Sequence, residues 1–177
     1  MSGTRNLIII RERRVNIFAV DEDPELAAEA LADTHVVKMV LESGQILSTV
    51  HHRYGTNTPE MYKPTHPKHP CVLWAGETKS NYYWLRRHFT ALAVEYTYRY
   101  GKSHLTWEKL GKVMLLAPNL MPDGDRTPFA LAMPNQYKLL DDPVECYRAY
   151  YKFGKAHLHR YSYRPAPAWL EADGQIA

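Results

Sequence analysis

Apolar residues recur every three to four positions along most of the chain, the spacing of helices with one buried face. This period predicts helices over about 24–31, 34–51, 70–100 with a break at 76–80, 105–116 and 143–159. Pro24 and Pro143 each follow an aspartate, which is typical of a first helical turn. The pattern therefore predicts a mainly helical protein.

Capping residues and prolines set the expected helix boundaries. The expected N-caps are short polar side chains that accept a hydrogen bond from the first turn: Asp33 or Thr34, Thr78 or Ser80, and Ser103. Gly101 is expected to close the long helix. Residues 53–69 and 118–136 are rich in proline and predict two long irregular loops, and such long loops in a compact domain are usually functional or disordered.

The start of the chain has a different pattern. Residues 1–14 show no helical period and are interpreted as an N-terminal extension or an added edge strand. Residues 15–20 alternate weakly and predict a short extended segment. A length of 177 residues favours one domain. We therefore expect an all-α, single compact helical domain over 15–177, with long proline-rich loops.

Composition excludes several classes of protein. Hydrophobic residues make up 45% and charged residues 23%, as in ordinary globular proteins, and no apolar run approaches the length that crosses a bilayer. Cys71 and Cys146 are too few for a disulfide framework, and no secretory signal precedes them. We expect a cytoplasmic protein without a membrane partner.

The second predicted helix carries a narrow polar stripe. At 100° per residue, apolar side chains including Val37 and Leu41 fill a broad arc, and the remaining polar side chains lie within about 80° of one another. They are His35, Lys38, Glu42, Gln45 and Thr49. One interpretation is an ordinary amphipathic helix with a Lys38–Glu42 pair that contributes a few tenths of a kcal/mol. The other is a catalytic site in which Glu42, His35 and Lys38 perform acid–base or covalent chemistry.

A second polar cluster lies in the first proline-rich loop. It contains Lys63, His66, Lys68 and His69, just before Cys71. Such a set can bind zinc, but neither Cys-x-x-Cys nor His-Glu-x-x-His accompanies it, so contact with phosphate is favoured and no metal is expected. The chain also lacks a Walker motif and Gly-x-Gly-x-x-Gly, so no nucleotide cofactor, and no other cofactor, is expected.

The C-terminal part combines basic and aromatic residues. No Asp or Glu occurs between residues 146 and 170, and five tyrosines alternate there with Arg148, Lys152, Lys155, Arg160 and Arg164. Cations neutralise phosphates and flat rings stack on bases, so this composition is typical of a nucleic-acid surface. The alternative is a helix with buried tyrosines and a solvated basic face.

At this point the chain resembles a known family, the pyrimidine-dimer DNA glycosylases similar to phage endonuclease V. The resemblance rests on Leu31-Ala-Asp-Thr-His35 with Glu42 seven residues later, on residues 70–85 with Asn81-Tyr-Tyr-Trp84, and on Arg164-Pro-Ala-Pro-Ala-Trp169. It implies an all-helical fold, double-stranded DNA with a damaged or modified base as the partner, and a catalytic role for Glu42.

Two features differ from that family's pattern. The family uses its own N-terminal amine as the nucleophile, whereas fourteen residues precede Val15 here. The family also places arginines around its glutamate, whereas this chain has Leu41 and Gln45. A lyase step and specificity for dimers are therefore open.

These patterns lead to one principal hypothesis and two alternatives. The principal hypothesis is a DNA N-glycosylase for a damaged or modified pyrimidine, with Glu42 as the catalytic carboxylate. Its expected DNA-binding residues are Gln45, Lys63, His66, His69, Asn81, Arg148, Lys152, Lys155 and Arg160. Tyr82 and Trp84 are candidates for stacking on a base, although core positions are favoured for both. The alternatives are a transferase that modifies a thymine in phage-type DNA, and a non-catalytic nucleic-acid-binding module.

Overall fold

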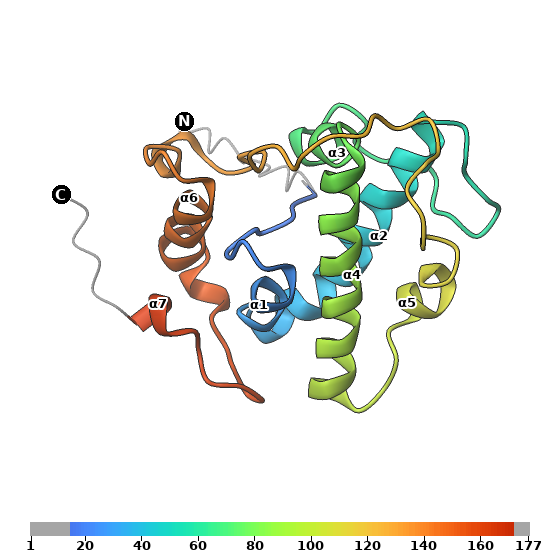
Figure 1. Cartoon of the computed structure of the whole chain (residues 1–177). Helices are drawn as coiled ribbons and strands as arrows, with labels where there is room; N and C mark the ends of the chain where they lie inside the picture. Colours follow the sequence, from blue (N-terminus) through green and yellow to red (C-terminus); the bar gives the residue numbers. More distant parts are fainter. Residues whose placement is uncertain (1–14, 172–177) are drawn as a thin grey trace, which may run out of the picture.

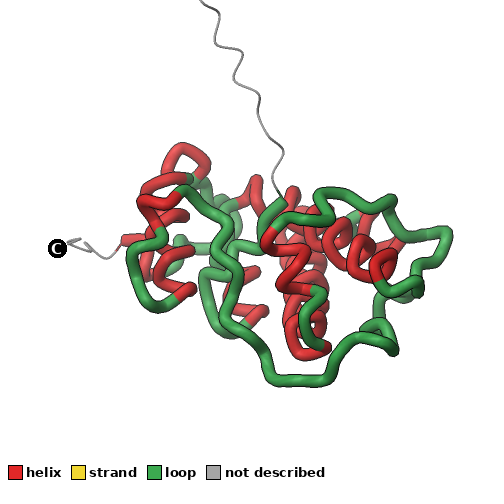
Figure 2. The backbone as a smooth tube through the Cα atoms, turned by 90° about the horizontal axis from the view of Figure 1, so that it is seen from above, coloured by secondary structure: helices red, strands yellow, loops and turns green. Residues whose placement is uncertain are grey.

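The structure is a computed structural model that describes residues 15–171, and this part of the chain contains helices and loops but no strand (Figure 2). The α-helices are α1 (Pro24–Glu29), α2 (Asp33–Arg53), α3 (Pro70–Ala75), α4 (Lys79–Tyr100), α5 (Leu105–Leu110), α6 (Pro143–Ala149) and α7 (Ala168–Glu171). The shorter turns are η1 (Asn135–Tyr137), the π-helix η2 (Tyr150–Gly154) and η3 (Ala156–Leu158). The predicted all-α class is confirmed.

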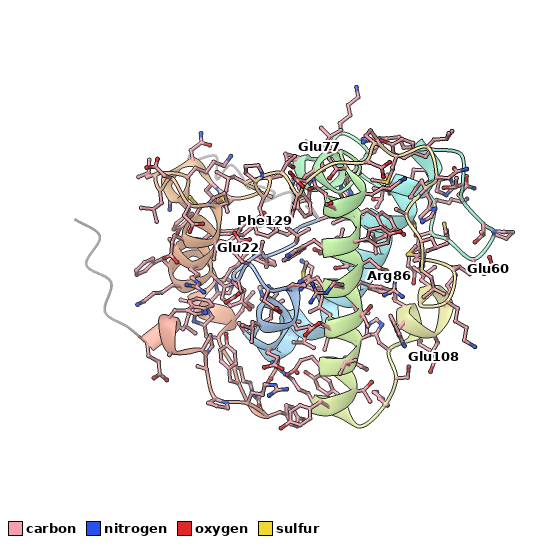
Figure 3. The ribbon with its side chains drawn as sticks, in the orientation of Figure 1. Glu22, Glu60, Glu77, Arg86, Glu108 and Phe129 are labelled. Atoms are coloured by element: carbon pink, nitrogen blue, oxygen red, sulfur yellow. The ribbon has the colours of Figure 1, made fainter. Side chains whose placement is uncertain are left out.

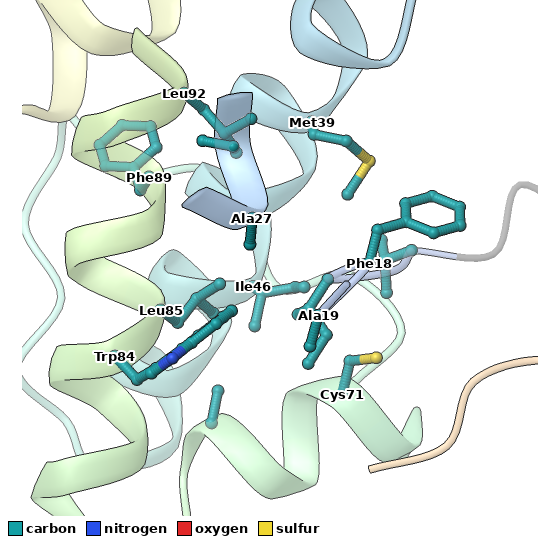
Figure 4. Packing of buried hydrophobic residues seen from close by; sticks show 14 of the residues in the cluster. Phe18, Ala19, Ala27, Met39, Ile46, Cys71, Trp84, Leu85, Phe89 and Leu92 are labelled. Atoms are coloured by element: carbon teal, nitrogen blue, oxygen red, sulfur yellow. The ribbon is translucent and has the colours of Figure 1, made fainter. Parts of the chain in front are cut away.

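Helix α4 lies at the centre of the molecule and packs mainly against α1 and α2 (Figure 1). Residues 15–20 run between α4 and α6, and all six are buried. Figure 4 shows Phe18, Ala19, Ile46, Cys71 and Leu85, which come from four different segments, gathered in one core. The expected extended segment is therefore an irregular stretch inside the core, where its apolar side chains are removed from water.

Several helix boundaries agree with the sequence prediction. Asp23 and Asp142 cap α1 and α6, and a proline occupies the first turn of each. The Thr78 side chain accepts from the Asn81 N–H at the start of α4, and Gly101 ends this helix with φ 66°. Glycine is favoured there because it adopts a left-handed conformation without a Cβ clash. These boundaries depend on neighbouring residues alone.

The predicted cap of α2 is wrong. The N-cap residue is Ala32, which makes no side-chain capping bond. The Asp33 carboxylate instead accepts from Arg99 Nη1 at 3.1 Å and from the Ser162 N–H at 2.9 Å. Distant parts of the chain therefore use the carboxylate that was expected to cap the helix.

Helix α5 is shorter than predicted and has a different cap. His104, not Ser103, caps it, because His104 Nδ1 accepts from the Thr106 N–H. The helix ends at Leu110 instead of 116. Arg86 lies between α4 and α5 (Figure 3) and donates to the carbonyls of Gly111 at 3.0 Å and Met114 at 2.6 Å. These bonds satisfy carbonyls in the irregular segment that follows α5.

The last helix also differs from the prediction. A regular helix was expected to continue to about His159, but α6 ends at Ala149 and the chain continues as η2 and η3. Gly154 permits this change, because a Cβ there would lie 2.6 Å from the Tyr150 ring. The following tail is held by Trp169, which packs against Tyr151 and Arg148.

The exposed face of α2 is displaced from the predicted polar stripe. Val37 and Leu41, which were expected to be buried, are 39% and 38% exposed, whereas His35, Glu42 and Thr49 are buried. No helix in the described part of the chain is long and apolar enough to span a membrane.

Candidate active site around Glu42

Glu42 lies at the edge between the buried and exposed faces of α2. Its side chain is 9% exposed, and Lys38 Nζ lies 3.0 Å from Oε1. The other oxygen, Oε2, accepts a hydrogen bond of 3.1 Å from the main-chain nitrogen of Asn16. The Glu42 carboxylate is therefore held by one partner on its own helix and by one partner in the buried segment 15–20.

Burial sets the proton affinity of this carboxylate. Removal from water raises the pKa of Glu42 above its ordinary value, while the Lys38 ammonium and the Asn16 N–H act in the opposite direction. A carboxylate with a raised pKa accepts protons more readily near neutral pH than an exposed one. Glu42 thus has the environment of an acid–base group.

His35 lies one helical turn before Lys38 and faces inward. Its ring stacks on Phe18 with centroids 4.7 Å apart, and Nδ1 lies 2.8 Å from the Tyr151 hydroxyl. Burial, followed by the positive charge of Lys155, lowers the pKa of His35 to about 3. The imidazole is therefore neutral at physiological pH, and it orients its neighbours without carrying a charge.

The first proline-rich loop is bonded to α2 two helical turns after Glu42. Thr49 Oγ1 accepts from the Thr65 N–H at 3.1 Å. Gln45 is half-buried on the same helix, whereas Lys63 and His66 are exposed. This attachment brings part of the predicted phosphate-binding loop onto the helix that carries Glu42.

His69 has a structural role at the end of this loop. Its Nδ1 accepts from the Cys71 N–H at 3.2 Å and so caps α3. Cys71 is fully buried, and burial raises the pKa of its thiol to about 12. Among residues 15–171, no three His, Cys, Asp or Glu side chains are grouped so that they could hold a metal ion.

Asn81 lies in the interior on α4, and it bonds α3 and the second long loop. It is 0% exposed, and its amide donates to the Trp74 carbonyl and to Thr127 Oγ1, each at 2.8 Å. These bonds attach the long loop 118–134 to α4. Tyr82 and Trp84 are also buried, as the favoured interpretation expected.

The predicted basic surface divides into two groups. Arg148 donates to the Val20 carbonyl and to the carboxylates of Asp21 and Glu145, so it joins α6 to the end of the buried segment 15–20. Arg160 is exposed, and Lys152 and Lys155 are half-buried. Lys155 contributes to the electrostatics of both Glu42 and His35, which places its charge near the candidate site.

Sequence reasoning identified the segment at Val15 and Asn16 as the place where the family's N-terminus would be expected, but it assigned no role to the Asn16 side chain or to Phe18. The other signal in the sequence is a single polar residue inside the run Val-Asn-Ile-Phe-Ala-Val. Buried polar side chains in native proteins have hydrogen-bond partners. The distant partners of Asn16 are Glu42 for its main-chain N–H and Ala132 for its side chain, 26 and 116 residues away. The pattern marked the residue as unusual without indicating what it contacts.

Fold and site together define an all-helical protein in which a buried carboxylate is bonded to a lysine and to a buried segment. A family model described as pyrimidine dimer DNA glycosylase matches residues 15–109, which is more than half of the chain. The chain therefore belongs to the pyrimidine dimer DNA glycosylase family, and membership of this family implies DNA as the substrate. No curated protein and no solved structure gives a significant match. The matched residues include Asn16, His35, Lys38 and Glu42, whereas α6 and the basic segment lie outside them.

Proposed function

We propose that this protein is a DNA N-glycosylase that removes a damaged or modified pyrimidine, with Glu42 as its catalytic carboxylate. The observation that carries the proposal is the arrangement at Glu42, where a buried carboxylate is bonded by Lys38 and by the Asn16 N–H. Lone buried carboxylates are costly, and a partnered one with a raised pKa is typical of a catalytic site.

Glu42 has two roles in the proposed reaction. Cleavage of the bond between base and sugar develops positive charge on the sugar, and a nearby carboxylate stabilises that charge. The same carboxylate accepts a proton from the attacking group, as a general base does. Lys38 and the Asn16 N–H keep Glu42 ionised and oriented for both roles.

Water is the proposed nucleophile. Lys38 is paired with Glu42 at 3.0 Å, and an ammonium in such a pair has no free lone pair for attack. The Asn16 nitrogen is equally close, but it belongs to the peptide bond with Val15 and is therefore an amide. The intact chain accordingly releases the base without forming an imine and without cutting the strand.

DNA binding is assigned to the cationic side chains near this site. Among the residues expected to bind DNA, Lys155 is the one whose charge acts on Glu42. We assign contacts with the DNA backbone to it and to Lys152, Arg160, Lys63 and His66, of which the last three are exposed. An enzyme that acts on a base takes it out of the stack, which costs a few kcal/mol. Phosphate contacts stabilise the DNA in this deformed state.

Replacement of the carboxylate tests the proposal. Glu42→Gln keeps the size of the side chain and removes the base, so release of the pyrimidine is expected to fall by at least about 100-fold. DNA binding should persist, because removal of a negative charge does not weaken attraction to phosphate. Glu60→Gln, which changes an exposed glutamate in the first loop, is the matched control and should act like the unmodified protein. Undiminished base release by Glu42→Gln would contradict the proposal.

A further inference from the structure

Asn16 connects three separate parts of the molecule. It is 7% exposed, and both its main chain and its side chain are bonded. The main-chain nitrogen donates to Glu42 Oε2 at 3.1 Å, and Nδ2 donates to the Ala132 carbonyl at 2.8 Å. The residue therefore links the candidate carboxylate on α2 to the long loop 118–134.

The side-chain oxygen of Asn16 fixes the path of its own segment. Oδ1 accepts from the N–H groups of Ile17 at 2.7 Å and Phe18 at 2.9 Å. This pattern is an Asx turn, in which a side chain replaces a backbone turn partner. Phe18 completes the turn with φ 41°, a left-handed conformation that is strained for an aromatic residue. Surrounding contacts must hold it there.

The turn directs Phe18 onto the site. The Phe18 ring stacks on His35, and its centroid lies 6.1 Å from the centroid of the Tyr150 ring. The same turn leaves the Asn16 N–H directed at Glu42. The three bonds made by the Asn16 side chain thus determine where its main-chain donor lies.

We propose that Asn16 is a positioning residue for Glu42, whose side chain aims the peptide N–H at Oε2 and so orients the carboxylate. The catalytic part of this inference rests on the proposed function, whereas the geometric part does not. Other titratable groups also interact with Glu42: Lys38 from α2, Cys71 from α3, and Lys155 after η2. None of them replaces the bond that Asn16 makes to Oε2.

The sign of the expected effect follows from this hydrogen bond. A donor on a carboxylate stabilises the charged form, so its loss raises the pKa of the acid. Asn16→Ala removes the turn and the bond to loop 118–134, and the N–H is then no longer held at Oε2. The pKa of Glu42 should rise by about one unit, and activity should begin to fall at a correspondingly higher pH as the solution is acidified.

The test is a carbon NMR titration of Glu42 in the full-length protein with labelled glutamate, in which Glu42→Gln identifies the signal. Asn16→Ala should raise the titration midpoint, and Asn16→Ser should partly restore it because a hydroxyl can accept from the Phe18 N–H. Thr127→Val is the control, because it breaks a bond between Asn81 and the same loop without touching Asn16. It should leave the midpoint unchanged.

A parallel measurement follows base release against pH. For Asn16→Ala, kcat should fall about tenfold with little change in KM, and the acidic limb should move to higher pH. If Asn16→Ala does not fold, Asn16→Ser should still give a smaller shift in the same direction, because it keeps an acceptor for the Phe18 N–H but lacks the Nδ2 that donates to Ala132. An unchanged Glu42 midpoint in folded variants would overturn the inference. Absence of base release by the unmodified protein would overturn only the proposed function, because the titration does not depend on activity.

Discussion

Lys38 and Asn16 place two nitrogen atoms at almost equal distances from the Glu42 carboxylate, 3.0 and 3.1 Å. Their chemistry differs, because one is an ammonium in an ion pair and the other is a peptide amide. Neither is a neutral amine in the intact chain. In the proposed function, the choice of water as the nucleophile rests on the chemical state of these two atoms.

Borohydride trapping tests this assignment. With substrate present, the intact protein should release base and give no covalent adduct, because an imine does not form with water as the nucleophile. A variant prepared with Asn16 as its first residue should form an adduct, because its free amine would lie beside Glu42.

An adduct on the intact chain would contradict the assignment. Lys38→Ala identifies its source, since this substitution abolishes an adduct on the lysine and leaves one on an N-terminal amine.

The sequence predicted part of the site at this scale. Glu42 and Lys38 are four residues apart on one helix, so their contact follows from helical geometry. The contact with Asn16 depends on how segment 15–20 packs in the core, and no local pattern determines that packing. The prediction that Val37 and Leu41 are buried was wrong for the same reason, because both side chains are partly exposed.

At the scale of elements, the basic segment 146–170, which begins within α6, contains residues with different roles. Arg148 is bonded to Val20, Asp21 and Glu145 and holds α6 in place. Arg160 is exposed, with its side chain bonded to its neighbour Ser162. Salt dependence separates a residue that holds the fold from one that contacts phosphate.

The combined substitution of Lys152 and Arg160 by alanine should weaken binding to every DNA sequence. Each lost phosphate contact should reduce the slope of log affinity against log salt by about one unit. Arg148→Ala should instead lower stability and leave the slope unchanged. A slope unchanged by the double substitution would indicate that the segment is a solvated basic face that does not contact DNA. The measurement follows binding alone and does not depend on catalysis.

Helix boundaries show which elements were predictable. The start and end of α4 depend on Thr78 and Gly101, which act within one turn. Helix α5 and the segment after α6 depend on Arg86 and on the close approach of Gly154 to Tyr150. Contacts between distant or crowded side chains leave no periodic signal, so these ends could not be predicted.

At the scale of the whole molecule, a buried ion network holds the helices and the C-terminal tail together. The Arg99 side chain is 0% exposed and bonds the carboxylates of Asp33 and Glu95 and the carbonyls of Glu29 and Leu31. Arg164 from the tail bonds the same Glu95 at 2.8 Å. Loss of one partner leaves buried charges uncompensated.

Arg99→Met should therefore lower the free energy of unfolding by about 3–5 kcal/mol. Arg87→Met is the matched control on the same helix, because Arg87 forms an exposed pair with Glu25 and should contribute less than about 1 kcal/mol. Urea denaturation measures both. Equal losses for the two variants would show that the buried network has no special role in holding the fold.

The central claim is that this helical protein releases a pyrimidine base from DNA with Glu42 as the catalytic carboxylate. Mass analysis of the products tests it most directly, after incubation of the intact protein with duplexes that each carry one pyrimidine lesion or modification. The predicted result is a free pyrimidine and an uncut strand with an abasic site, both absent with Glu42→Gln. A gain of mass on the DNA would indicate a transferase instead. Binding with no change in either strand would indicate a non-catalytic module, and each of these results would contradict the claim.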